Sequence, residues 1–596
     1  TLVGMVGSID NDMFGTDMTI GADSALHRIT EAIDAIHSTA SSHQRAFVVE
    51  VMGRNCGYLA LMSAVAAGAN WVLIPENPPE EDDWEESMMG ALKDGRSIGR
   101  RLNIVIVAEG AQDKYGNPIT ADYVSSVLSD RLGEDTRVTS LGHVQRGGAP
   151  SAFDRYLSTV LGYAAVEQVV TSPGGEAQLI GLKEHQIISS PLMECVEQTQ
   201  AVADRIAEQD YETAMEMRGG SFGDSFRMIK TMVRAKPHAP DPEQRRLRLG
   251  ILHAGGPAPG MNPAVRVAVR VGIDKGHTMF GIRNGFRGFE SGDIHEMDWM
   301  SVNGWASRGG AELGTSRHKP RGEHFAQIAE NIEKYQLDGL LMIGGWAGYL
   351  IASQLRQEAE QHPALDIPIV CLPAAINNDL PGSELAIGAD TALNNIVADV
   401  DKIKQSAVAS GRCLVVEVMG RDCGYLALMS GLATGAERVY LPEEGISLRD
   451  LESDVNSLKD GFRRGKRLGL VITTENADPV YDSGFIKQLF ERESEGLFSV
   501  RQSILGHIQQ GGDPSPFDRI QSTRFASKSL NYLIDQALSD SPQSAFMGLQ
   551  HGKIVFTPLA QFPELIEPEA HRPTDQSWMS LMPLAKVMGR PGVPAL

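Results

Sequence analysis

The chain contains the same sequence twice. Residues 48–69 (VVEVMGRNCGYLALMSAVAAGA) match residues 415–436 (VVEVMGRDCGYLALMSGLATGA) at 18 of 22 positions, with an offset of 367 between the copies. Two further segments repeat in the same way: 7–26 with 374–393 at the same offset, and 141–155 with 505–519 at an offset of 364. The chain is therefore a tandem duplication, and both copies should build the same elements in the same order.

The two copies meet in a proline-rich segment. Residues 235–250 (AKPHAPDPEQRRLRLG) carry three prolines among mixed charges, which is typical of an extended linker. We expect a first half at 1–234, a linker at 235–247 and a second half at 248–596. The second copy starts near Arg246, and 246 − 367 = −121, so the first copy lacks roughly the first 120 residues of the second. With no initiator Met, the chain is interpreted as N-terminally incomplete, a fragment or a processed product.

Composition excludes several classes of protein. The chain has 596 residues, of which 42% are hydrophobic, so it can form several packed domains. Its 54 basic and 76 acidic residues give a net charge of −22, which argues against a nucleic-acid binder. It has no long apolar run and no signal sequence, so we expect no membrane association and a cytoplasmic location. Its five cysteines lack CxxC or Cys/His spacing, which indicates a reducing compartment and no structural zinc.

Short apolar runs alternate with helical patterns. RAFVVEVMG, from Arg45, and RLNIVIVAEG, from Arg101, are rich in Val and Ile and end in turn sequences, as buried parallel strands do. Residues 248–272 form a strand, a glycine-rich turn and a helix, and 339–345 form another strand. The sequence therefore predicts an α/β protein with parallel, Rossmann-like sheets flanked by helices. Ligands bind such sheets at the carboxyl ends of the strands, where the polar motifs lie.

The motif SIDND places two carboxylates in one turn. If the backbone is extended, Asp10 and Asp12 project to one side, which suits a general base next to a group that helps to hold a metal-bound phosphate. An Asx-rich turn is the alternative. In the second copy Asn377 replaces the first Asp while Asn378 and Asp379 are kept. The turn is thus retained and the base is lost, which favours a chemical role for Asp10.

Basic side chains follow the predicted strands. Arg54 stands directly after a strand, whereas Arg45 lies at its other end, about 23 Å away in an extended chain. One ligand within a subunit cannot readily touch both, so Arg45 either is a surface charge or reaches a neighbouring subunit's site. His143, Arg146 and Arg137 form a basic cluster beside paired glycines, suited to a phosphate or sugar phosphate. Glu109 could accept hydrogen bonds from a substrate hydroxyl or cap a helix.

The second copy contains a glycine-rich turn of its own. GGPAPGMN, residues 255–262, lies between a strand and a helix, and resembles a nucleotide phosphate loop. In IGGWAGY, Trp346 and Ala347 stand where an acidic metal ligand would be expected. The second copy is therefore predicted to keep the scaffold of a nucleotide loop without its metal ligand.

Jointly these motifs resemble the phosphofructokinase family, in particular the duplicated eukaryotic, fungal-type ATP-dependent 6-phosphofructokinases. The segments that carry the resemblance are SIDND, HQRAFVVEVMGRNCGY, VAEG, RVTSLGHVQRGG, GGPAPGMN and GTSR. The resemblance implies a tandem duplicated phosphofructokinase fold and an allosteric, glycolytic kinase. That kinase transfers a phosphoryl group from Mg-ATP to the 1-hydroxyl of fructose 6-phosphate, giving fructose 1,6-bisphosphate.

The resemblance also implies roles for residues of the first half. Asp10 would be the general base, Asp12 would support the metal and the nucleotide phosphates, and Arg54 would neutralise charge on the transferred group. Arg45 and Arg137 would clamp the 6-phosphate in a neighbouring subunit, which implies a homo- or hetero-oligomer, a tetramer or larger. The full substrate site would comprise Ser8, Ile9, Asp10, Arg45, Met52, Gly53, Arg54, Glu109, Arg137, His143, Val144, Gln145 and Arg146.

The second half would bind fructose 2,6-bisphosphate as an allosteric effector. The matching positions are Arg317, Ala375, Ile376, Asn377, Asn378, Asp379, Arg412, Met419, Gly420, Arg421, Glu475, Arg501, His507, Ile508, Gln509 and Gln510, with Arg572 as a further phosphate ligand. Asn377 in place of Asp10 and Gln510 in place of Arg146 remove the base and one cation, so this half would bind without catalysing.

Mg²⁺ and ATP are the cofactors that the resemblance implies, but the main metal ligand is not identified in the sequence. The family's catalytic nucleotide loops belong to the stretch that the first copy lacks. One alternative is therefore a non-catalytic, sugar-phosphate-sensing regulatory subunit or fragment. A pyrophosphate-dependent relative is another, although a regulatory-type second half favours ATP.

Overall fold

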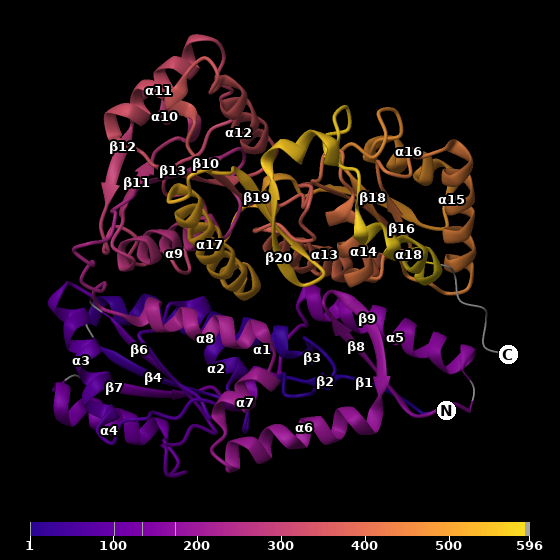
Figure 1. The fold of residues 1–596 in the computed structure, drawn as a ribbon. Coiled ribbons are helices and arrows are strands. Elements are labelled where there is room, and N and C mark those ends of the chain that lie inside the picture. The colour runs from indigo at the N-terminus through magenta and orange to yellow at the C-terminus, as the bar shows by residue number, and fades with distance from the viewer. Residues whose placement is uncertain (1, 44, 101, 134, 173, 590–596) are drawn as a thin grey trace.

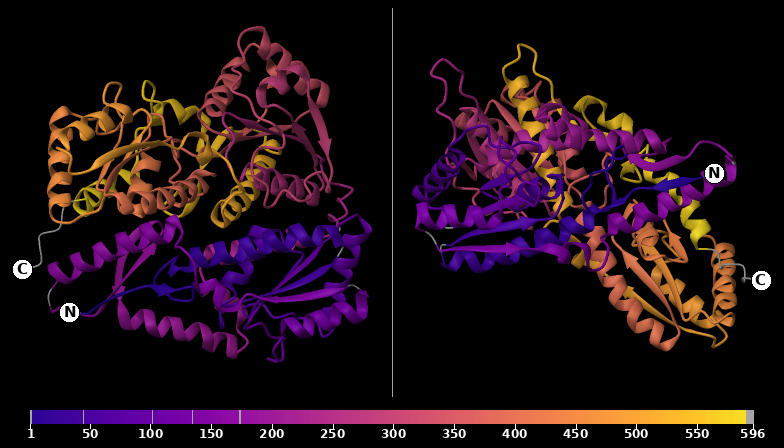
Figure 2. Two further views of the ribbon diagram at one scale, coloured as in Figure 1. Left: turned by 180° about the vertical axis from the view of Figure 1, so that it is seen from behind. Right: turned by 90° about the horizontal axis from the view of Figure 1, so that it is seen from below.

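In the computed structural model the two halves pack against each other. The structure describes residues 2–43, 45–100, 102–133, 135–172 and 174–589. Figures 1 and 2 show the first half, indigo to magenta, lying along the second half, pink to yellow. Residues 234–247, between the last helix of the first half and the first strand of the second, contain no helix or strand. The domain bounds set from the sequence stay a prediction.

Each half contains one four-stranded parallel sheet of the same topology. The order is β5-β6-β4-β7 in the first half and β16-β17-β15-β18 in the second. The strands are β4 (Ala46–Val51), β5 (Trp71–Leu73), β6 (Asn103–Ala108), β7 (Thr136–Ser140), β15 (Arg412–Val418), β16 (Arg438–Tyr440), β17 (Leu468–Thr474) and β18 (Ser499–Ile504). Val49 pairs with Ile106 and Thr139, and its repeat Val416 pairs with Ile472 and Ser503, so the two sheets share one register.

The second sheet differs between the halves. In the second half it has seven strands in the order β12-β11-β10-β13-β14-β19-β20, and in the first half it has three, β1-β8-β9. Its strands are β1 (Val3–Met5), β8 (Gln178–Lys183), β9 (Gln186–Pro191), β10 (Arg248–Ala254), β11 (Thr278–Ile282), β12 (Ile294–Met297), β13 (Gly339–Gly344), β14 (Ile369–Pro373), β19 (Ala545–Gln550) and β20 (Lys553–Pro558). β1, β8 and β9 repeat β14, β19 and β20, with the same parallel and antiparallel pairings.

Helices cover the faces of these sheets. The repeated pairs are α1 (Ala22–His43) with α13 (Ala389–Ser410), α2 (Tyr58–Ala67) with α14 (Tyr425–Thr434), α3 (Trp84–Ser97) with α15 (Leu448–Arg463), α4 (Ala121–Leu132) with α16 (Ser483–Glu493), and α5 (Ala152–Thr171) with α17 (Pro516–Ala537). The N-caps repeat too, because Ser151 and Ser515 each accept the amide of an Asp three residues on. Only the second half has α9 (Met261–Asp274), α10 (Gly285–Ser291), α11 (Glu323–Tyr335) and α12 (Trp346–Glu358) among the described residues.

The two halves end in different ways. After β9 the first half continues into α6 (Leu192–Ala207), α7 (Tyr211–Met217) and α8 (Gly220–Val233). After β20 the second half continues into η4 (Leu559–Leu565), β21 (Ile566–Glu567), β22 (Arg572–Pro573), η5 (Ser577–Leu581) and α18 (Met582–Met588). The remaining short elements are β2 (Gly7–Ser8), β3 (Ile20–Gly21), η1 (Gly142–Arg146), η2 (Pro363–Leu365) and η3 (Gly506–Gln510).

One hydrophobic core crosses the boundary between the halves. It includes fully buried side chains of α2, α9, α14 and α17, among them Leu59, Val265, Leu426 and Leu530. The polar contacts across the boundary are reciprocal. Arg155 pairs with Asp401 at 2.6 Å, and their repeats, Arg519 and Asp34, pair at 2.6 Å. The halves are therefore related by an approximate two-fold axis, the arrangement that a symmetric dimer of one ancestral unit would have. No helix in the described ranges has the length and apolar character needed to span a membrane.

Candidate functional site

The first-half site is built around the turn that follows β2. Asn11 holds this turn with a positive φ of 51°, where its side chain accepts the amide of Thr19 (2.8 Å) and donates to the carbonyl of Asp17 (3.1 Å). The hydroxyl of Ser8 donates to Asp12 at 2.8 Å and accepts the amide of Asp10 at 3.2 Å. The turn is thus fixed by Ser8 and Asn11, and none of these bonds involves the carboxyl group of Asp10.

The Asp10 carboxyl is buried and, within the described ranges, lacks hydrogen bonds that it could accept. It is 6% exposed, and its Oδ1 has no hydrogen-bond partner among the described residues. Burial raises the pKa of Asp10, and the negative charges of Asp12 and Glu109 raise it further, whereas the cations of Arg54 and Arg146 lower it. A carboxylate held between opposing charges, with an unoccupied acceptor oxygen, is suited to take a proton from a ligand.

The Arg54 turn follows β4 and is shaped by two side chains from neighbouring strands. Arg54 has a φ of 49°, and the carboxylate of Glu109 accepts its amide at 2.6 Å. The side chain of Gln145 accepts the amide of Met52 (3.1 Å) and donates to the carbonyl of Gly142 (3.0 Å). At Gly53 a Cβ would lie 2.3 Å from the carbonyl oxygen of Cys56, so only glycine fits.

These contacts refine two sequence assignments. The side chain of Gln145 is buried and bonded to backbone, so it positions the turn rather than facing a ligand. Glu109 is exposed, but one of its oxygens holds the Arg54 amide instead of capping a helix. Arg54, His143, Val144 and Arg146 are exposed around the edge, while Ser8, Ile9 and Met52 are half-buried between them and the sheet.

One buried ion pair was missed by the sequence reasoning. Arg218, between α7 and α8, pairs with the fully buried Glu76 at 2.8 Å, and it also donates to the carbonyls of Asn55 (2.9 Å) and Asp12 (3.4 Å). Glu76 in turn accepts the amide of Gly57, the first residue before α2. A single guanidinium therefore ties the Asp12 turn to the Arg54 turn. The sequence did contain one sign that Glu76 matters, because the second copy has Glu443 at the matching position.

Arg45 and Arg137 lie away from this site. Both stand at the amino end of the four-stranded sheet, where they share Asp135 at 2.8 and 3.1 Å. The structure thus separates them from Arg54 by the length of β4, as the strand arithmetic predicts. Their repeats, Arg412 and Arg501, stand at the amino ends of β15 and β18 in the same way.

The second half repeats the turns of the site, with amides in place of Asp10 and Arg146. Asn378 and Arg421 have φ values of 55° and 51°, matching Asn11 and Arg54. The same bonds shape the backbone: Glu475 accepts the Arg421 amide at 2.9 Å, and Gln509 accepts the Met419 amide at 3.1 Å. After β15, β17 and β18 of the four-stranded sheet come Met419, Gly420, Arg421, Glu475, His507, Ile508, Gln509 and Gln510. After β14 of the seven-stranded sheet come Ala375, Ile376, Asn377, Asn378 and Asp379. The two groups face each other, because the charge of Arg421 acts on Asp379.

Burial raises the pKa of Asp379 to about 6, although the side chain of Asn377 and the charge of Arg421 lower it. The Asn377 amide donates to Asp379 at 3.4 Å. In the first half, by contrast, the position before the shared Asn holds a second carboxylate. The second-half site therefore offers hydrogen bonds and an arginine but no counterpart of Asp10.

The glycine-rich turn of the second half borders this second site. Gln510 donates to the carbonyl of Pro257 at 2.9 Å, and Arg317 lies beside Gly256. Trp346 packs against Phe562 and His571, each with ring centroids 5.7 Å away. The position where an acidic metal ligand would be expected is thus part of an aromatic cluster. Arg572, next to that cluster, pairs with Glu567 at 2.8 Å.

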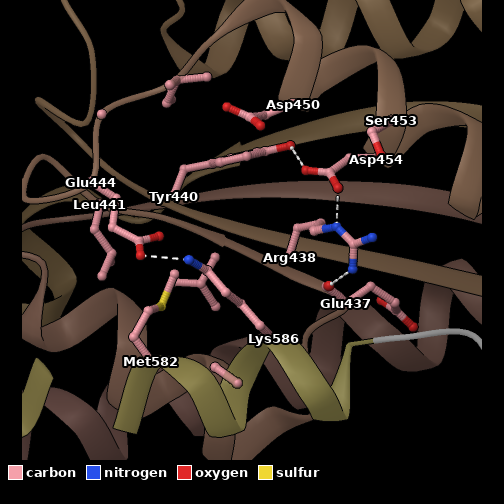
Figure 3. A pocket seen from close by; sticks show the side chains of 14 residues that line it. Glu437, Arg438, Tyr440, Leu441, Glu444, Asp450, Ser453, Asp454, Met582 and Lys586 are labelled. Atoms are coloured by element: carbon pink, nitrogen blue, oxygen red, sulfur yellow. Dashed lines mark hydrogen bonds and ion pairs between the residues drawn. The ribbon is translucent and has the colours of Figure 1, made fainter. Parts of the chain in front are cut away.

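A separate cavity of about 600 Å³ lies between β16 and α18 (Figure 3). Its charged groups are already paired: Arg438 and Tyr440 bind Asp454, and Lys586 binds Glu444. Arg438 also donates to the carbonyl of Gly589 at 3.0 Å. This cavity is where α18 is attached to the sheet, and its paired charges make it a poor candidate for catalysis.

Comparison with known proteins agrees with this architecture. The phosphofructokinase family model matches residues 1–169 and 248–533. An ATP-dependent 6-phosphofructokinase of Dictyostelium discoideum is 47% identical over 98% of this chain and 70% of its own length, and the human muscle-type enzyme is 43% identical over 99% and 76%.

Two solved structures have the same fold. Phosphofructokinase from Saccharomyces cerevisiae superposes with a TM-score of 0.95 at 38% identity, covering 98% of this chain and 80% of the other. Pichia pastoris phosphofructokinase in the T-state gives 0.94 at 39% identity, covering 99% and 69%. These matches confirm the resemblance and the fold class predicted from the motifs. The chain belongs to the phosphofructokinase family.

Proposed function

We propose that this chain is an ATP-dependent 6-phosphofructokinase, a phosphotransferase that acts on the 1-hydroxyl of fructose 6-phosphate. One observation carries the proposal: the first half keeps a buried, unpartnered Asp10 carboxylate among charged groups, and the second half has Asn377 at the matched position. The relatives named above carry this activity in their names. That support also weighs against the regulatory-subunit alternative, since those names all describe a kinase.

In the proposed reaction Asp10 accepts the proton of the 1-hydroxyl as that oxygen attacks the γ-phosphate of ATP. Arg54 lies at the exposed edge and stabilises negative charge on the transferred group. Mg²⁺, when bound with ATP, neutralises the phosphates. The carboxylate of Asp12 is a hard oxygen donor of the kind that suits this ion. Arg218 and Gln145 do not react, but they hold the two turns that carry Asp12 and Arg54.

The sugar would lie over the edge formed by Ser8, Met52, Glu109, His143 and Arg146. Arg45 and Arg137 would bind the 6-phosphate of a sugar held by a neighbouring subunit, because they lie at the opposite end of the sheet. This role requires an oligomer, and the compartment we propose is the cytoplasm.

The second half would bind fructose 2,6-bisphosphate as an effector. Its edge presents Arg421 and His507 at the turns and Arg317 beside the glycine-rich loop, while Arg412 and Arg501 again stand at the far end of the sheet. Arg572 would need to leave Glu567 in order to reach a phosphate. Such a pocket recognises an anionic sugar without supplying a base.

A coupled assay of fructose 1,6-bisphosphate formation from fructose 6-phosphate and Mg-ATP tests the proposal. We expect turnover by the unaltered chain, and a fall of about 10²- to 10⁴-fold in Asp10→Asn. Calorimetric titration with fructose 6-phosphate should give similar affinities for both. Sugar binding without turnover in the unaltered chain would overturn the kinase proposal and favour a regulatory subunit.

A further inference from the structure

Two histidines and a glutamate converge in the second half, beside the loop that carries Arg317. Glu290 lies at the end of α10, His318 in the loop after the GTSR motif, and His324 in the first turn of α11. One ligand atom from each lies within 4.8 Å of the others. All three are only partly exposed, with side-chain exposures of 20%, 30% and 32%. The cluster therefore faces solvent on one side and packed protein on the other.

The contacts within the cluster leave a place for a cation. Nε2 of His318 lies 2.7 Å from one oxygen of Glu290, and Nδ1 of His324 lies 3.6 Å from the same oxygen. That Nδ1 also accepts the backbone amide of Arg321 at 3.3 Å, so it carries no proton, and an ion bound through Nδ1 would take the place of this amide.

The scaffold beneath the cluster is already fixed. Asn331 of α11 donates to the backbone carbonyls of Phe289 and Glu290 at 2.9 and 3.0 Å, which binds α11 to the end of α10. Glu290 and His324 are therefore held relative to each other, and His318 is supplied by the loop. A preorganised pair with one ligand from a loop needs little rearrangement to close around an ion.

We propose that Glu290, His318 and His324 form a binding site for a divalent transition metal, of which Zn²⁺ is the best fit. Imidazole nitrogens with one carboxylate suit this class of ion better than Mg²⁺, which prefers oxygen ligands alone. With Zn–N and Zn–O bonds of about 2.0–2.1 Å, tetrahedral ligands stand about 3.3 Å apart. The distances from the Glu290 oxygen to His318 Nε2 (2.7 Å) and to His324 Nδ1 (3.6 Å) lie on either side of that spacing.

The lack of Cys/His spacing, which argued against structural zinc, does not apply to this cluster. Its ligands come from three segments and include no cysteine. Three protein ligands leave a fourth position for water. A bound ion would tie the loop that carries Arg317 to α10 and α11, and so would stabilise the side of the glycine-rich turn on which Arg317 lies.

Binding of Co²⁺ to the full chain, without an affinity tag and treated first with a chelator, tests the site. We expect one equivalent of Co²⁺ to bind with strong visible absorption bands typical of a four-coordinate ion, and one equivalent of Zn²⁺ to displace it. Glu290→Gln, His318→Gln and His324→Gln should each weaken binding by about 100-fold or more, beyond the effect of losing an outer partner.

His295→Gln is the matched control. His295 is an exposed histidine of β12 that pairs with Asp293 at 2.7 Å, outside the cluster. This variant should bind Co²⁺ like the unaltered chain. The proposal is overturned if the unaltered chain binds no stoichiometric Co²⁺ or Zn²⁺ at micromolar concentration, or if the three cluster variants bind as well as the control. Circular dichroism identifies any variant that fails to fold, and the remaining two then decide.

Discussion

Replacing Arg218 with glutamine would copy into the first half an arrangement that the second half already has. Glu76 and its repeat Glu443 occupy the same place: Glu76 accepts the amide of Gly57, just before α2, and Glu443 accepts the amide of Gly424, just before α14. In the first half Arg218 pairs with this carboxylate. In the second half Gln576, from the C-terminal segment, donates to it at 3.1 Å. The variant thus gives Glu76 a neutral amide partner, as Glu443 already has in the second half.

The size of the effect follows from burial. Glu76 is fully buried and the Arg218 side chain is 8% exposed. Removing one partner of such a pair costs about 3–5 kcal/mol, because the remaining charge is left uncompensated. A hydrogen bond from glutamine restores about 1 kcal/mol. We therefore expect Arg218→Gln to lower the free energy of unfolding by about 2–4 kcal/mol at pH 8.

The loss should depend on pH. Burial raises the pKa of Glu443, whose partner is the neutral Gln576, and Arg218→Gln gives the first half the same arrangement. A carboxyl whose folded-state pKa lies above its unfolded value binds more protons when folded, so stability falls as pH rises from about 4.5 through the folded pKa. The deficit relative to the unaltered chain should therefore be smaller at pH 5.5 than at pH 8.

Urea unfolding followed by circular dichroism at both pH values measures this deficit. Arg205→Gln is the control, because Arg205 is 44% exposed and pairs with Glu208 on the surface; it should cost less than about 1 kcal/mol at either pH. If Arg218→Gln is as mild as the control, or if its deficit does not grow with pH, the buried pair does not stabilise the two turns as argued.

Four further substitutions test other parts of the molecule. Arg146→Gln removes a cation that lowers the pKa of Asp10, so the acidic limb of the pH profile of kcat/KM should move to higher pH. If the limb does not move, Arg146 does not act on the base. Asp23→Asn removes a carboxyl whose pKa is raised by burial to about 7 and whose ionisation therefore opposes folding as pH rises from about 4 to 7. Urea unfolding should show a higher free energy of unfolding for the variant at pH 8 and little difference at pH 5. No gain at pH 8 would contradict this. Arg412→Ala should weaken activation by fructose 2,6-bisphosphate and leave basal turnover unchanged, whereas Arg45→Ala should raise the KM for fructose 6-phosphate. The reverse pattern would mean that the second half binds the substrate and the first half binds the effector.

The fold was readable from the sequence wherever a local pattern or the repeat carried the information. The apolar run from Arg45 predicts a strand, and β4 occupies Ala46–Val51. The repeat offset also locates the turns at Asp10 and Arg54, because both copies must form them. These elements depend on neighbours in the chain or on the duplication itself, so one sequence is enough to find them.

The remaining features depend on contacts between distant segments. Arg218 lies 142 residues from Glu76, and its counterpart Gln576 comes from a segment with no repeat in the first half. The cluster of Glu290, His318 and His324 likewise combines three elements whose sequence shows no metal-ligand spacing. In each case the deciding quantity is a distance set by helix packing, and no local pattern encodes it.

The two halves differ in charge more than in shape. Their turns agree within a few degrees of φ, and the same glutamate and glutamine side chains hold the backbone in both. Two of the changes between the repeats replace a charged group with an amide, Asp10 with Asn377 and Arg146 with Gln510. Outside the repeats, Gln576 takes the place beside Glu443 that Arg218 has beside Glu76.

An amide can donate and accept hydrogen bonds as the lost groups did, but it cannot take a proton from a hydroxyl or neutralise a phosphoryl group. Restoring one carboxylate at Asn377 would place it next to the buried Asp379 without the cation that Arg146 supplies in the first half, so desolvation and like charge would keep it protonated. We therefore attribute the proposed loss of catalysis in the second half to its set of charges, and the unchanged backbone fits the proposed binding of a sugar phosphate there.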